Sequence, residues 1–575
     1  MMRERPEKDS KSRQFPASEG GPKIAFMALM RHQALLATLV LGAALVTGSV
    51  TSSVGIDVTT YHNDNGRTGQ NLSETTLTWA NVNSGAFGKT AFLPTDGKVD
   101  AQPLYLSALS IPGQGARNML YVATEHGSVY GFDADSGAVV WRASTLGAGE
   151  TPSEAVFGCG QVTPEIGVTA TPVIDRARGV IYVAAMSKNA AGSYFQRLHA
   201  LDLTSGAEVL GGPRTIQATF PGSGAGSSGG VQTFNSKYYY ERAGLLLVNG
   251  RLILTFTSHC DDDPYTGWIL AYDPATLAQT GVLNVTPNGP TSGRGAIWMA
   301  GAGPAADAAG NVFLLDGNGD FDTVLDGNGF PSRGNFGNAF LKIATTGGLF
   351  VADYFATFNT VSQSAADVDL GSGGALVLPD LVDGSGRVRH LAVGAGKDTH
   401  LYVVDRDAMG KWSPSNNNNV YQDLSGALPG GVWSMPAYFN GTLYYGSNGA
   451  PLKAFPITNA RVAAAPASLS ARSFPYPGTT PGISASGTTN GIVWAVENAN
   501  PAVLHAYDAT NLAHELYNST QAGSRDSFGA GNKFITPTIV SGRVFVGTQT
   551  GVAVFGSLAS LAPAPPTNLR FVRGA

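Results

Sequence analysis

The chain has 575 residues, of which only 13% are charged, and its formal net charge is −5. No basic stripe appears along it, so the charge pattern excludes nucleic-acid binding through an electropositive surface. The low charge and the 74 glycines, together with abundant Ser, Thr and Asn, are typical of a β-rich exported protein with many tight turns.

Residues 27–53 are expected to form an export signal. Arg31 precedes an apolar run over residues 34–46, and small residues follow it. This order matches the charged, apolar and cleavable regions of a signal peptide, and the run is shorter than the roughly 20 residues of a membrane span. A non-cleaved anchor is the alternative. We therefore expect a secreted or periplasmic protein.

A repeat of about 50 residues follows. In residues 118–144, three β-forming runs are separated by His-Gly and Asp-Ser-Gly turns, which predicts three short antiparallel strands. The preceding "AQPLYLS" supplies a fourth, innermost strand. Four strands in roughly 50 residues form one blade of a β-propeller.

The pattern recurs along the chain until eight copies are found, and the eighth stops after three strands. Because a ring must close, the missing strand is expected to be "FGKTAFLP", residues 87–94. We therefore predict an all-β fold: an eight-bladed β-propeller of four-stranded antiparallel blades over residues 56–558. Seven blades, with one repeat miscounted, is the alternative.

The two ends of the chain are expected to lie outside this ring. Residues 1–26 are polar and are expected to be disordered, or to precede a true start at Met27 or Met30. Residues 559–575 form an Ala/Pro-rich tail. Its "PPTNLRFV" resembles the first strand of a fibronectin type III module, and a disordered tail is the alternative.

The two cysteines, Cys159 and Cys260, permit one disulfide in an oxidising compartment. The sequence leaves open whether they pair. No CxxCH motif is present, so the chain encodes no covalent haem site. Gly-x-Ser-x-Gly and P-loop motifs are also absent, so serine-hydrolase and nucleotide-hydrolase functions have no signal.

"VYGFDADSGAVVW", residues 129–141, resembles the repeat of pyrroloquinoline-quinone (PQQ) propellers. This resemblance implies that Trp141 packs between blades. Residues 61–90, 394–410 and 430–446 resemble the quinoprotein alcohol dehydrogenases more specifically. That resemblance implies a PQQ- and calcium-dependent enzyme that oxidises an alcohol or sugar and passes electrons to a separate acceptor. Similar repeats occur in non-catalytic propellers, so a scaffold that binds a protein partner and has lost the cofactor is the alternative.

The resemblance implies roles for three residues. Asn318 matches an amide ligand of calcium, and an amide oxygen suits a hard cation. Asp369, preceded by Val368 where the family has an aromatic, matches the catalytic base that takes the proton of the substrate hydroxyl beside the metal. Lys397 matches the cation that touches the reactive quinone oxygens. A turn residue, a strand cap and a loop lysine are the plainer alternatives, and Asp367 is a second candidate base.

The segment around Asn318, "NVFLLDGNGDFD" over residues 311–322, also carries alternating oxygen-bearing side chains, as a helix–loop–helix calcium site does. Such a site needs Gly at its sixth position and Glu at its twelfth. Phe321 and Gly327 stand there, which disfavours this kind of site.

The chain departs from the family at its metal-binding Glu. The matching stretch offers Lys188 and Asn189 but no carboxylate. Glu165, directly ahead of an inner strand, is the predicted substitute. The loop "SHCDDDPYTGW", residues 258–268, is another possible cation site, but we expect a solvated loop or a disulfide rim there; it has no second His at metal spacing, which disfavours zinc.

A second departure concerns the cofactor. In the family a Trp and a disulfide between adjacent cysteines sandwich the quinone, and this chain has no adjacent cysteines. The matching Trp position falls near Ala302, and Trp298 lies close to it in the sequence. Trp298 and Trp433 are therefore the predicted aromatic contacts of the cofactor.

Overall fold

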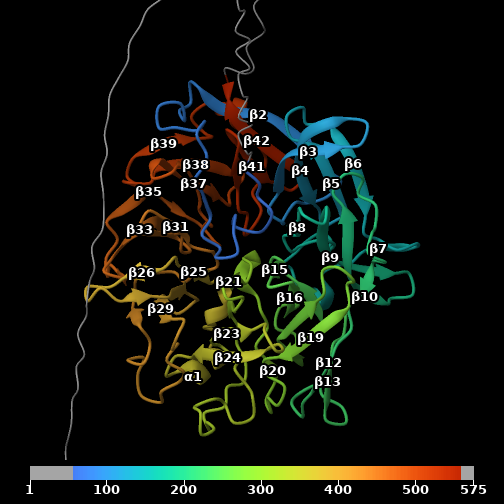
Figure 1. Ribbon diagram of the computed structural model, residues 1–575, viewed down its shortest axis with the longest axis vertical. Helices are drawn as coiled ribbons and strands as arrows, with labels where there is room; N and C mark the ends of the chain where they lie inside the picture. The colour runs from blue at the N-terminus through green and yellow to red at the C-terminus, as the bar shows by residue number, and fades with distance from the viewer. Residues whose placement is uncertain (1–55, 559–575) are drawn as a thin grey trace, which may run out of the picture. The chain divides into compact units, whose positions relative to one another are not determined.

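The computed structural model describes residues 56–558, so the expected signal peptide, residues 1–26 and the Ala/Pro-rich tail lie outside the described residues. Eight antiparallel sheets succeed one another once around a common centre (Figure 1). The prediction of an eight-bladed propeller is confirmed, and the seven-bladed alternative is wrong.

The first four blades follow one another in chain order. Blade 1 holds β3 (Leu104–Ile111), β4 (Gly115–Ala123), β5 (Ser128–Asp133) and β6 (Val139–Ser144). Blade 2 holds β8 (Val173–Asp175), β9 (Val180–Asn189), β10 (Tyr194–Asp202) and β11 (Arg214–Thr215), with β7 (Glu150–Pro152) beside β9. Blade 3 holds β14 (Tyr239–Glu241), β15 (Leu246–Val248), β16 (Arg251–Ser258), β18 (Trp268–Tyr272) and β19 (Gln279–Asn284). Blade 4 holds β21 (Ala305–Ala306), β22 (Val312–Leu315), β23 (Phe340–Ala344) and β24 (Phe350–Phe355).

The remaining four blades complete the ring. Blade 5 holds β25 (Leu376–Val377), β28 (Leu391–Gly394), β29 (Leu401–Asp405) and β30 (Gln422–Leu424). Blade 6 holds β31 (Ala437–Phe439), β32 (Thr442–Tyr445), β33 (Ala450–Thr458), β34 (Arg461–Val462) and β35 (Ser468–Phe474). Blade 7 holds β36 (Gly482–Ser486), β37 (Thr489–Glu497), β38 (Val503–Asp508) and β39 (Glu515–Asn518), with β1 (Gln70–Asn71) parallel to β36. Blade 8 holds β40 (Thr538–Val540), β41 (Arg543–Gly547), β42 (Gly551–Ser557) and β2 (Phe87–Pro94).

Short elements lie between the blades. The strands are β12 (Thr219–Pro221), β13 (Val231–Thr233), β17 (Tyr265–Thr266), β20 (Gly293–Arg294), β26 (Leu381–Val382) and β27 (Val388–Arg389). The helices are η1 (Val156–Gly158), η2 (Met299–Gly301), α1 (Thr360–Ala365), η3 (Leu370–Ser372) and η4 (Gly523–Asp526). In the part of the chain that the structure describes, no helix is long and apolar enough to cross a membrane.

An Asp turn ends the third strand of a blade and fixes the register of the fourth. The Asp133 carboxylate accepts hydrogen bonds from the backbone N–H groups of Asp135 and Ser136, at 3.0 and 2.9 Å. Gly137 follows with a φ of 75°, the left-handed conformation that glycine adopts without strain. The Asp-Ser-Gly motif of the sequence therefore acts as a hairpin turn.

The residue that follows such an Asp joins neighbouring blades, because its backbone carbonyl accepts a hydrogen bond from a side chain of the preceding blade. Trp141 of blade 1 is 7% exposed, and its indole N–H donates to the Leu203 carbonyl of blade 2 at 3.0 Å, so its predicted packing between blades is confirmed. Tyr182 of blade 2 donates to the Pro274 carbonyl of blade 3 at 2.5 Å. The same contact links the last blade to the first, where Arg543 donates to the Ala134 carbonyl.

The ring is closed by two segments from opposite ends of the described chain. Strand β2 pairs antiparallel with β42, from Phe87 opposite Ser557 to Pro94 opposite Gly551. Figure 1 shows β2 lying beside β42 at the point where the colour passes from red back to blue. The predicted closing strand, residues 87–94, is therefore confirmed.

Residues 58–71, here called the hub segment, run through the centre of the ring along the innermost strands. Arg67 lies at its middle and is 0% exposed. Its guanidinium donates to the Pro304 carbonyl and the Thr60 hydroxyl at 2.8 and 2.7 Å, so its buried charge is hydrogen-bonded. The hub segment bonds every blade in turn, through Val58–Tyr105, Thr59–Ile174, Asn65–Leu247, Asn65–Ala306, Gly66–Val377, Thr68–Tyr438, Gly69–Ile483 and Asn71–Ile539.

Candidate functional site

A cavity lies where loops from blades 2 to 8 meet, and it encloses about 630 Å³ of empty space including its open mouth. Its lining residues follow second strands or precede innermost strands. Because these strands are antiparallel neighbours, such positions share one face of the ring. The lining comprises Gln161, Tyr240, Arg242, Cys260, Asp261, Trp298, Ala300, Asp367, Asp369, Ser372, Lys397, Trp433, Tyr476 and Phe534.

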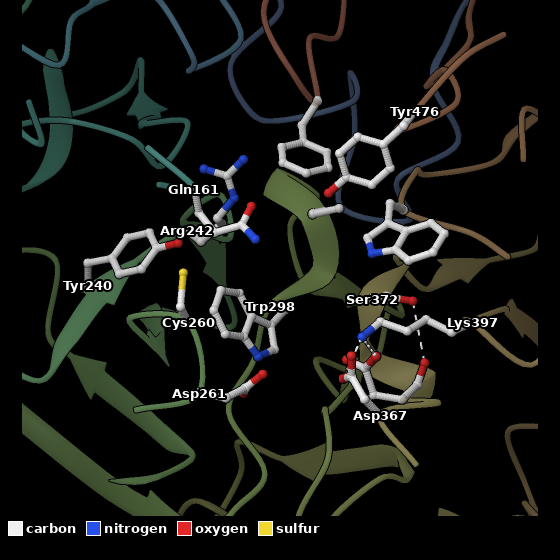
Figure 2. Close-up of a pocket in the computed structure, with 14 residues that line it drawn as sticks. Gln161, Tyr240, Arg242, Cys260, Asp261, Trp298, Asp367, Ser372, Lys397 and Tyr476 are labelled. Atoms are coloured by element: carbon white, nitrogen blue, oxygen red, sulfur yellow. Dashed lines mark hydrogen bonds and ion pairs between the residues drawn. The ribbon is translucent and has the colours of Figure 1, made fainter. Parts of the chain in front are cut away.

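Lys397 and two carboxylates form the most strongly coupled group in the cavity. The Lys397 ammonium lies 2.8 Å from an Asp369 carboxylate oxygen and 2.7 Å from one of Asp367. Backbone contacts hold the arrangement, because the Lys397 N–H donates to the Asp369 carbonyl at 3.0 Å. Figure 2 shows Lys397 and Asp367 on one side of the cavity, across from Tyr240 and Cys260.

Asp369 is 4% exposed and immediately precedes η3. Burial raises its pKa to about 6, Lys397 opposes that rise, and the charges of Asp367 and Asp261 add to it. The pKa of Lys397 is raised: burial lowers it, but the adjacent carboxylates outweigh that effect. At neutral pH the pair is therefore a carboxylate with a fixed ammonium beside it.

Asn318 lies beside this group, directly outside the cavity lining, and is 4% exposed. Its amide N–H donates to Asp367 at 2.7 Å. Its amide oxygen is buried and has no hydrogen-bond partner. The structure thus brings together Asn318 of blade 4, Lys397 of blade 5 and Asp369 from the connection between these two blades, and leaves one acceptor free for a ligand.

The alternating Asp residues around Asn318 accept hydrogen bonds from backbone N–H groups. Asp316 accepts from the Ala339 N–H at 2.5 Å, and burial raises its pKa well above the usual range. Asp320 accepts from three consecutive N–H groups, and Asp322 from two. These contacts agree with the sequence argument against a helix–loop–helix calcium site.

Trp298 provides a flat surface inside the cavity. Figure 2 shows its indole in the middle of the lining side chains, between Cys260 and Lys397. A Cβ atom placed on Gly317 would lie 3.0 Å from the Trp298 ring and 3.3 Å from an Asp369 oxygen. The indole and the carboxylate therefore both pack against Gly317. Trp433 stands nearby, with its ring centre 6.0 Å from the Lys397 ammonium. Both predicted aromatic contacts therefore line the cavity.

The cysteines form a disulfide, Cys159–Cys260, which settles the pairing that the sequence left open. Cys260 lines the cavity together with Trp298. The bridge joins loops 101 residues apart rather than adjacent residues. The cavity consequently has both an indole and a disulfide in its lining, without the vicinal cysteines of the resembled family.

Asp261 is a cavity residue that the sequence analysis did not select. It follows Cys260, bonds the Tyr265 hydroxyl, and raises the pKa of Asp369. Its loop is the disulfide rim that was one of the two expectations, through Cys260; within it His259 is 1% exposed, and burial lowers its pKa to about 4. The sequence did contain a signal for Asp261. The second strands of blades 3, 4 and 5 end at residues 258, 315 and 394, and Asp261, Asn318 and Lys397 each lie three positions further on.

Glu165 is not among the cavity residues. Its carboxylate lies 3.0 Å from His126 Nδ1 and is partly exposed. Lys188 and Asn189 are also outside, with Lys188 paired to Glu154. The predicted substitute for the missing carboxylate is therefore not brought to Asn318, whereas Asp261 lines the same cavity as Asp369.

The donor set fits a hard cation in part. An orphaned amide oxygen on Asn318 and carboxylates on Asp369 and Asp261 are the oxygen ligands that such cations prefer. Within residues 56–558, no three His, Cys, Asp or Glu side chains are placed to hold a metal by themselves. A cation here would need further oxygens from water or from a bound cofactor.

The solved structures that resemble this chain over most of its length include the following three. The quinohemoprotein alcohol dehydrogenase from Comamonas testosteroni superposes with a TM-score of 0.58 at 15% identity, covering 89% of this chain and 82% of that one. The quinohemoprotein alcohol dehydrogenase from Pseudomonas putida HK5 gives 0.58 at 12% identity, with the same 89% and 82% coverage. A europium-containing methanol dehydrogenase gives 0.55 at 12% identity, covering 88% and 98%.

The chain has the fold of a quinoprotein dehydrogenase propeller. No protein-family model matches the sequence, and a search of curated proteins found no match. At identities of 12 to 15%, the likeness concerns the fold alone, and it agrees with the sequence resemblance to PQQ propellers.

Proposed function

We propose that the protein is an exported PQQ- and metal-dependent dehydrogenase that oxidises a small alcohol or sugar. The observation that carries this proposal is the buried Asp369 carboxylate, held against the Lys397 ammonium in a cavity that also contains Trp298. The Cys159–Cys260 disulfide and the sequence signal support export to an oxidising compartment, secreted or periplasmic.

Asp369 acts as the general base. With its pKa raised to about 6, it is ionised at neutral pH and is a stronger base than an ordinary carboxylate. It takes the proton of the substrate hydroxyl. Lys397 keeps a positive charge at the place where negative charge develops, a contribution that needs no reorganisation during the reaction.

PQQ, when bound, supplies the acceptor for the substrate's hydride equivalent. Trp298 and the disulfide would offer it flat, polarisable surfaces, and Trp433 would flank it. Asn318, Asp369 and Asp261 would hold the metal ion, calcium or another hard cation. Electrons would leave to a separate acceptor, because the chain carries no CxxCH motif for haem.

The test is reconstitution. Purified protein is incubated with PQQ and Ca²⁺ or a lanthanide ion and desalted, and its absorbance spectrum and dye-linked oxidation of alcohols and sugars are recorded. We expect retained quinone absorbance and metal-dependent oxidation. A spectrum free of quinone would overturn the proposal and leave the fold as a binding or scaffold propeller.

A matched pair of variants tests the metal ligand. Asp261→Asn should raise the metal concentration needed for half-maximal PQQ retention, because it removes a charged oxygen from the site. Asp262→Asn, in the same loop but outside the cavity lining, should leave it unchanged. Equal behaviour of the two variants would remove Asp261 from the proposed ligand set.

A further inference from the structure

A second cavity, with about 780 Å³ of empty space including its open mouth, adjoins the candidate site, and the two share Gln161 and Arg242. Three cations line it or stand at its edge. We call this space the basic vestibule; its lining includes Lys98, Asp100, Arg242, Asn498, Asn532 and Lys533. It is the feature of the cavity system that the proposed chemistry leaves unused.

The positive charge of the basic vestibule is not balanced by the protein. Lys98 is paired with Asp100 at 2.9 Å, so those two charges cancel. Glu125, behind Asp100, is 0% exposed, and burial with the neighbouring Asp100 charge raises its pKa to about 8, so it is mostly neutral at pH 7. Two cations, Arg242 and Lys533, then remain without a counter-charge.

Arg242 and Lys533 have no acidic partner among the residues from 56 to 558, where no carboxylate oxygen lies within 4.0 Å of either cation. Arg242 is 4% exposed, and its buried Nη1 has no hydrogen-bond partner. The pKa of Lys533 is lowered by burial and by the charges of Arg242 and Lys98. The Arg242 guanidinium lies over the Phe534 ring, with its central carbon 4.5 Å from the ring centre, but this contact supplies no negative charge. A buried guanidinium without an anionic partner is unfavourable, so this arrangement calls for an anion.

The joined cavities are electrically polarised. Asp261, Asp367 and Asp369 stand in the candidate site, and Arg242 marks the boundary with the basic vestibule. In the candidate site the three carboxylates outnumber the one ammonium, Lys397, so a ligand that spans both cavities meets an excess of carboxylates at one end and cations without acidic partners at the other. Charge complementarity of this kind fixes the orientation of a bound molecule.

We propose that the substrate is an alcohol carrying an anionic group, a carboxylate or a phosphate, which binds between Arg242 and Lys533 while its hydroxyl faces Asp369. This inference rests on the proposed dehydrogenase function. In the reaction Asp369 would take the O–H proton, the C–H hydrogen would leave with its electron pair as hydride, which bound PQQ would accept, and a C=O bond would form. The anionic group is unchanged and serves only for binding.

The experiment measures binding to the cofactor-free protein, so it does not depend on turnover. Isothermal titration compares 4-hydroxybutyrate and inorganic phosphate with uncharged 1,4-butanediol. We expect the anions to bind and the diol not to bind, with affinity that falls as salt is added. Comparing 4-hydroxybutyrate with phosphate distinguishes the two kinds of anionic group. Wild-type protein that binds neither anion more tightly than the diol would overturn the inference.

Lys533→Gln is the primary variant because Lys533 lines only the basic vestibule and is partly exposed. It should weaken anion binding about tenfold, as loss of one charge-assisted hydrogen bond does, and Lys533→Glu should abolish it. Arg387→Gln, which removes an exposed cation of blade 5, is the matched control and should bind as the wild type does. Unchanged affinity in both Lys533 variants would contradict the proposal.

PQQ retention, measured on the same variants, separates this inference from the proposed function. If Lys533→Gln loses PQQ but keeps its affinity for the anions, the basic vestibule serves the cofactor and the inference is wrong. If PQQ is retained and no anion binds, the inference fails while the dehydrogenase proposal stands. If anions bind through Lys533 but PQQ is never retained, the dehydrogenase proposal fails and the anion site remains.

Discussion

Asp369 shows how two opposing effects set the chemistry of one residue. Burial at 4% exposure disfavours its charge, and Lys397 at 2.8 Å favours it. The result is a pKa of about 6 rather than the ordinary value of 3.8. A carboxyl group in this range is ionised at neutral pH yet basic enough to accept a proton from a hydroxyl.

The first prediction concerns the pH dependence of alcohol oxidation. Because the base must be ionised, kcat/KM in the reconstituted enzyme should fall as the pH drops through the pKa of Asp369, which is about 6 in the metal-free protein and lower once a cation binds the carboxylate. Asp369→Asn should lower kcat roughly 10²- to 10⁴-fold. Asp407→Asn, at an exposed position, is the control. A variant that keeps the wild-type profile would show that another group is the base.

Sequence reasoning located some site residues and missed others for a physical reason. Asn318, Asp369 and Lys397 were found because each lies in a short segment that matches the resembled family: Asn318 and Lys397 follow β22 and β28, and Asp369 precedes η3. Asp261 was missed because its loop reads as polar and solvated unless the distant Cys159 is known to tie it down. Glu165 precedes an inner strand, yet its carboxylate turns to His126, a contact that no local pattern encodes.

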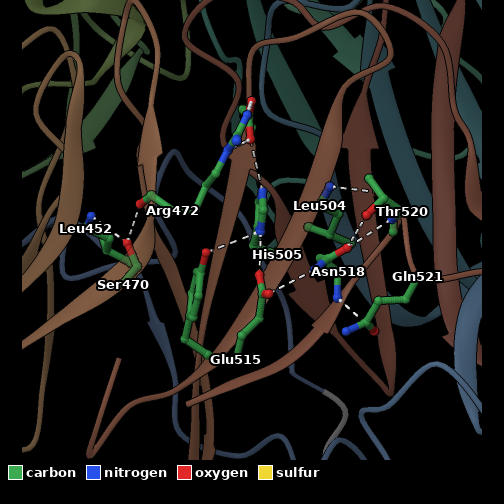
Figure 3. Close-up of polar contacts among 12 residues, drawn as sticks. Leu452, Ser470, Arg472, Leu504, His505, Glu515, Asn518, Thr520 and Gln521 are labelled. Atoms are coloured by element: carbon green, nitrogen blue, oxygen red, sulfur yellow. Dashed lines mark hydrogen bonds and ion pairs between the residues drawn. The ribbon is translucent and has the colours of Figure 1, made fainter. Parts of the chain in front are cut away.

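At the scale of strands, blade 7 contains a charged network buried between neighbouring sheets (Figure 3). His505 on β38 lies 2.6 Å from Glu515 and 3.4 Å from Glu497. Arg472, on β35 of blade 6, donates to the Glu497 carboxylate at 2.7 Å. The network therefore joins two blades.

The second prediction is a pH-dependent stability difference. Burial lowers the pKa of His505, but the two glutamates outweigh it and the net pKa is raised. The protonated histidine thus stabilises the fold fully below its ordinary pKa of 6.5, and this contribution is lost as the pH rises through the higher folded value. His505→Gln should therefore cost about 1 kcal/mol at pH 6 and less at alkaline pH.

Urea unfolding of the wild type and the His505→Gln variant at several pH values measures this difference. His390→Gln, at a position where the imidazole is 39% exposed, is the control and should show little change. A difference in unfolding free energy that grows with pH would contradict the assignment of a charged His505.

At the scale of the whole molecule, ring closure depends on the core contacts of β2. Phe87 is 0% exposed and packs against Trp494 of blade 7 and Phe555 of blade 8, with ring centres 5.4 and 6.4 Å away. Phe92, on the same strand, is 38% exposed. One strand thus carries a buried and an exposed phenylalanine, which allows a matched comparison.

The third prediction is that Phe87→Ala lowers the free energy of unfolding by about 3–5 kcal/mol, because it leaves a cavity between two blades. Phe92→Ala should change it by less than about 1 kcal/mol. Chemical denaturation followed by tryptophan fluorescence measures both. Equal effects would mean that β2 does not hold the ring closed through Phe87.

The propeller itself could be predicted because its signals are local and repeated. Short turns that begin with an Asp, such as Asp133–Gly137, each set one hairpin, and the incomplete eighth repeat required a strand from elsewhere, found at residues 87–94. Long-range features could not be found this way. The path of the hub segment through the centre depends on Arg67 meeting carbonyls from other blades, such as Pro304 more than two hundred residues away.

The hub segment implies an order of assembly. Its contacts advance along the chain as the blades do, from Val58 with blade 1 and Thr59 with blade 2 to Gly69 with blade 7 and Asn71 with blade 8. The hub segment is synthesised before all eight blades. When a blade emerges, the hub residue that it will bond is therefore already present. The blades can therefore be added to the hub segment one after another in chain order, and β42 is the last strand to be added.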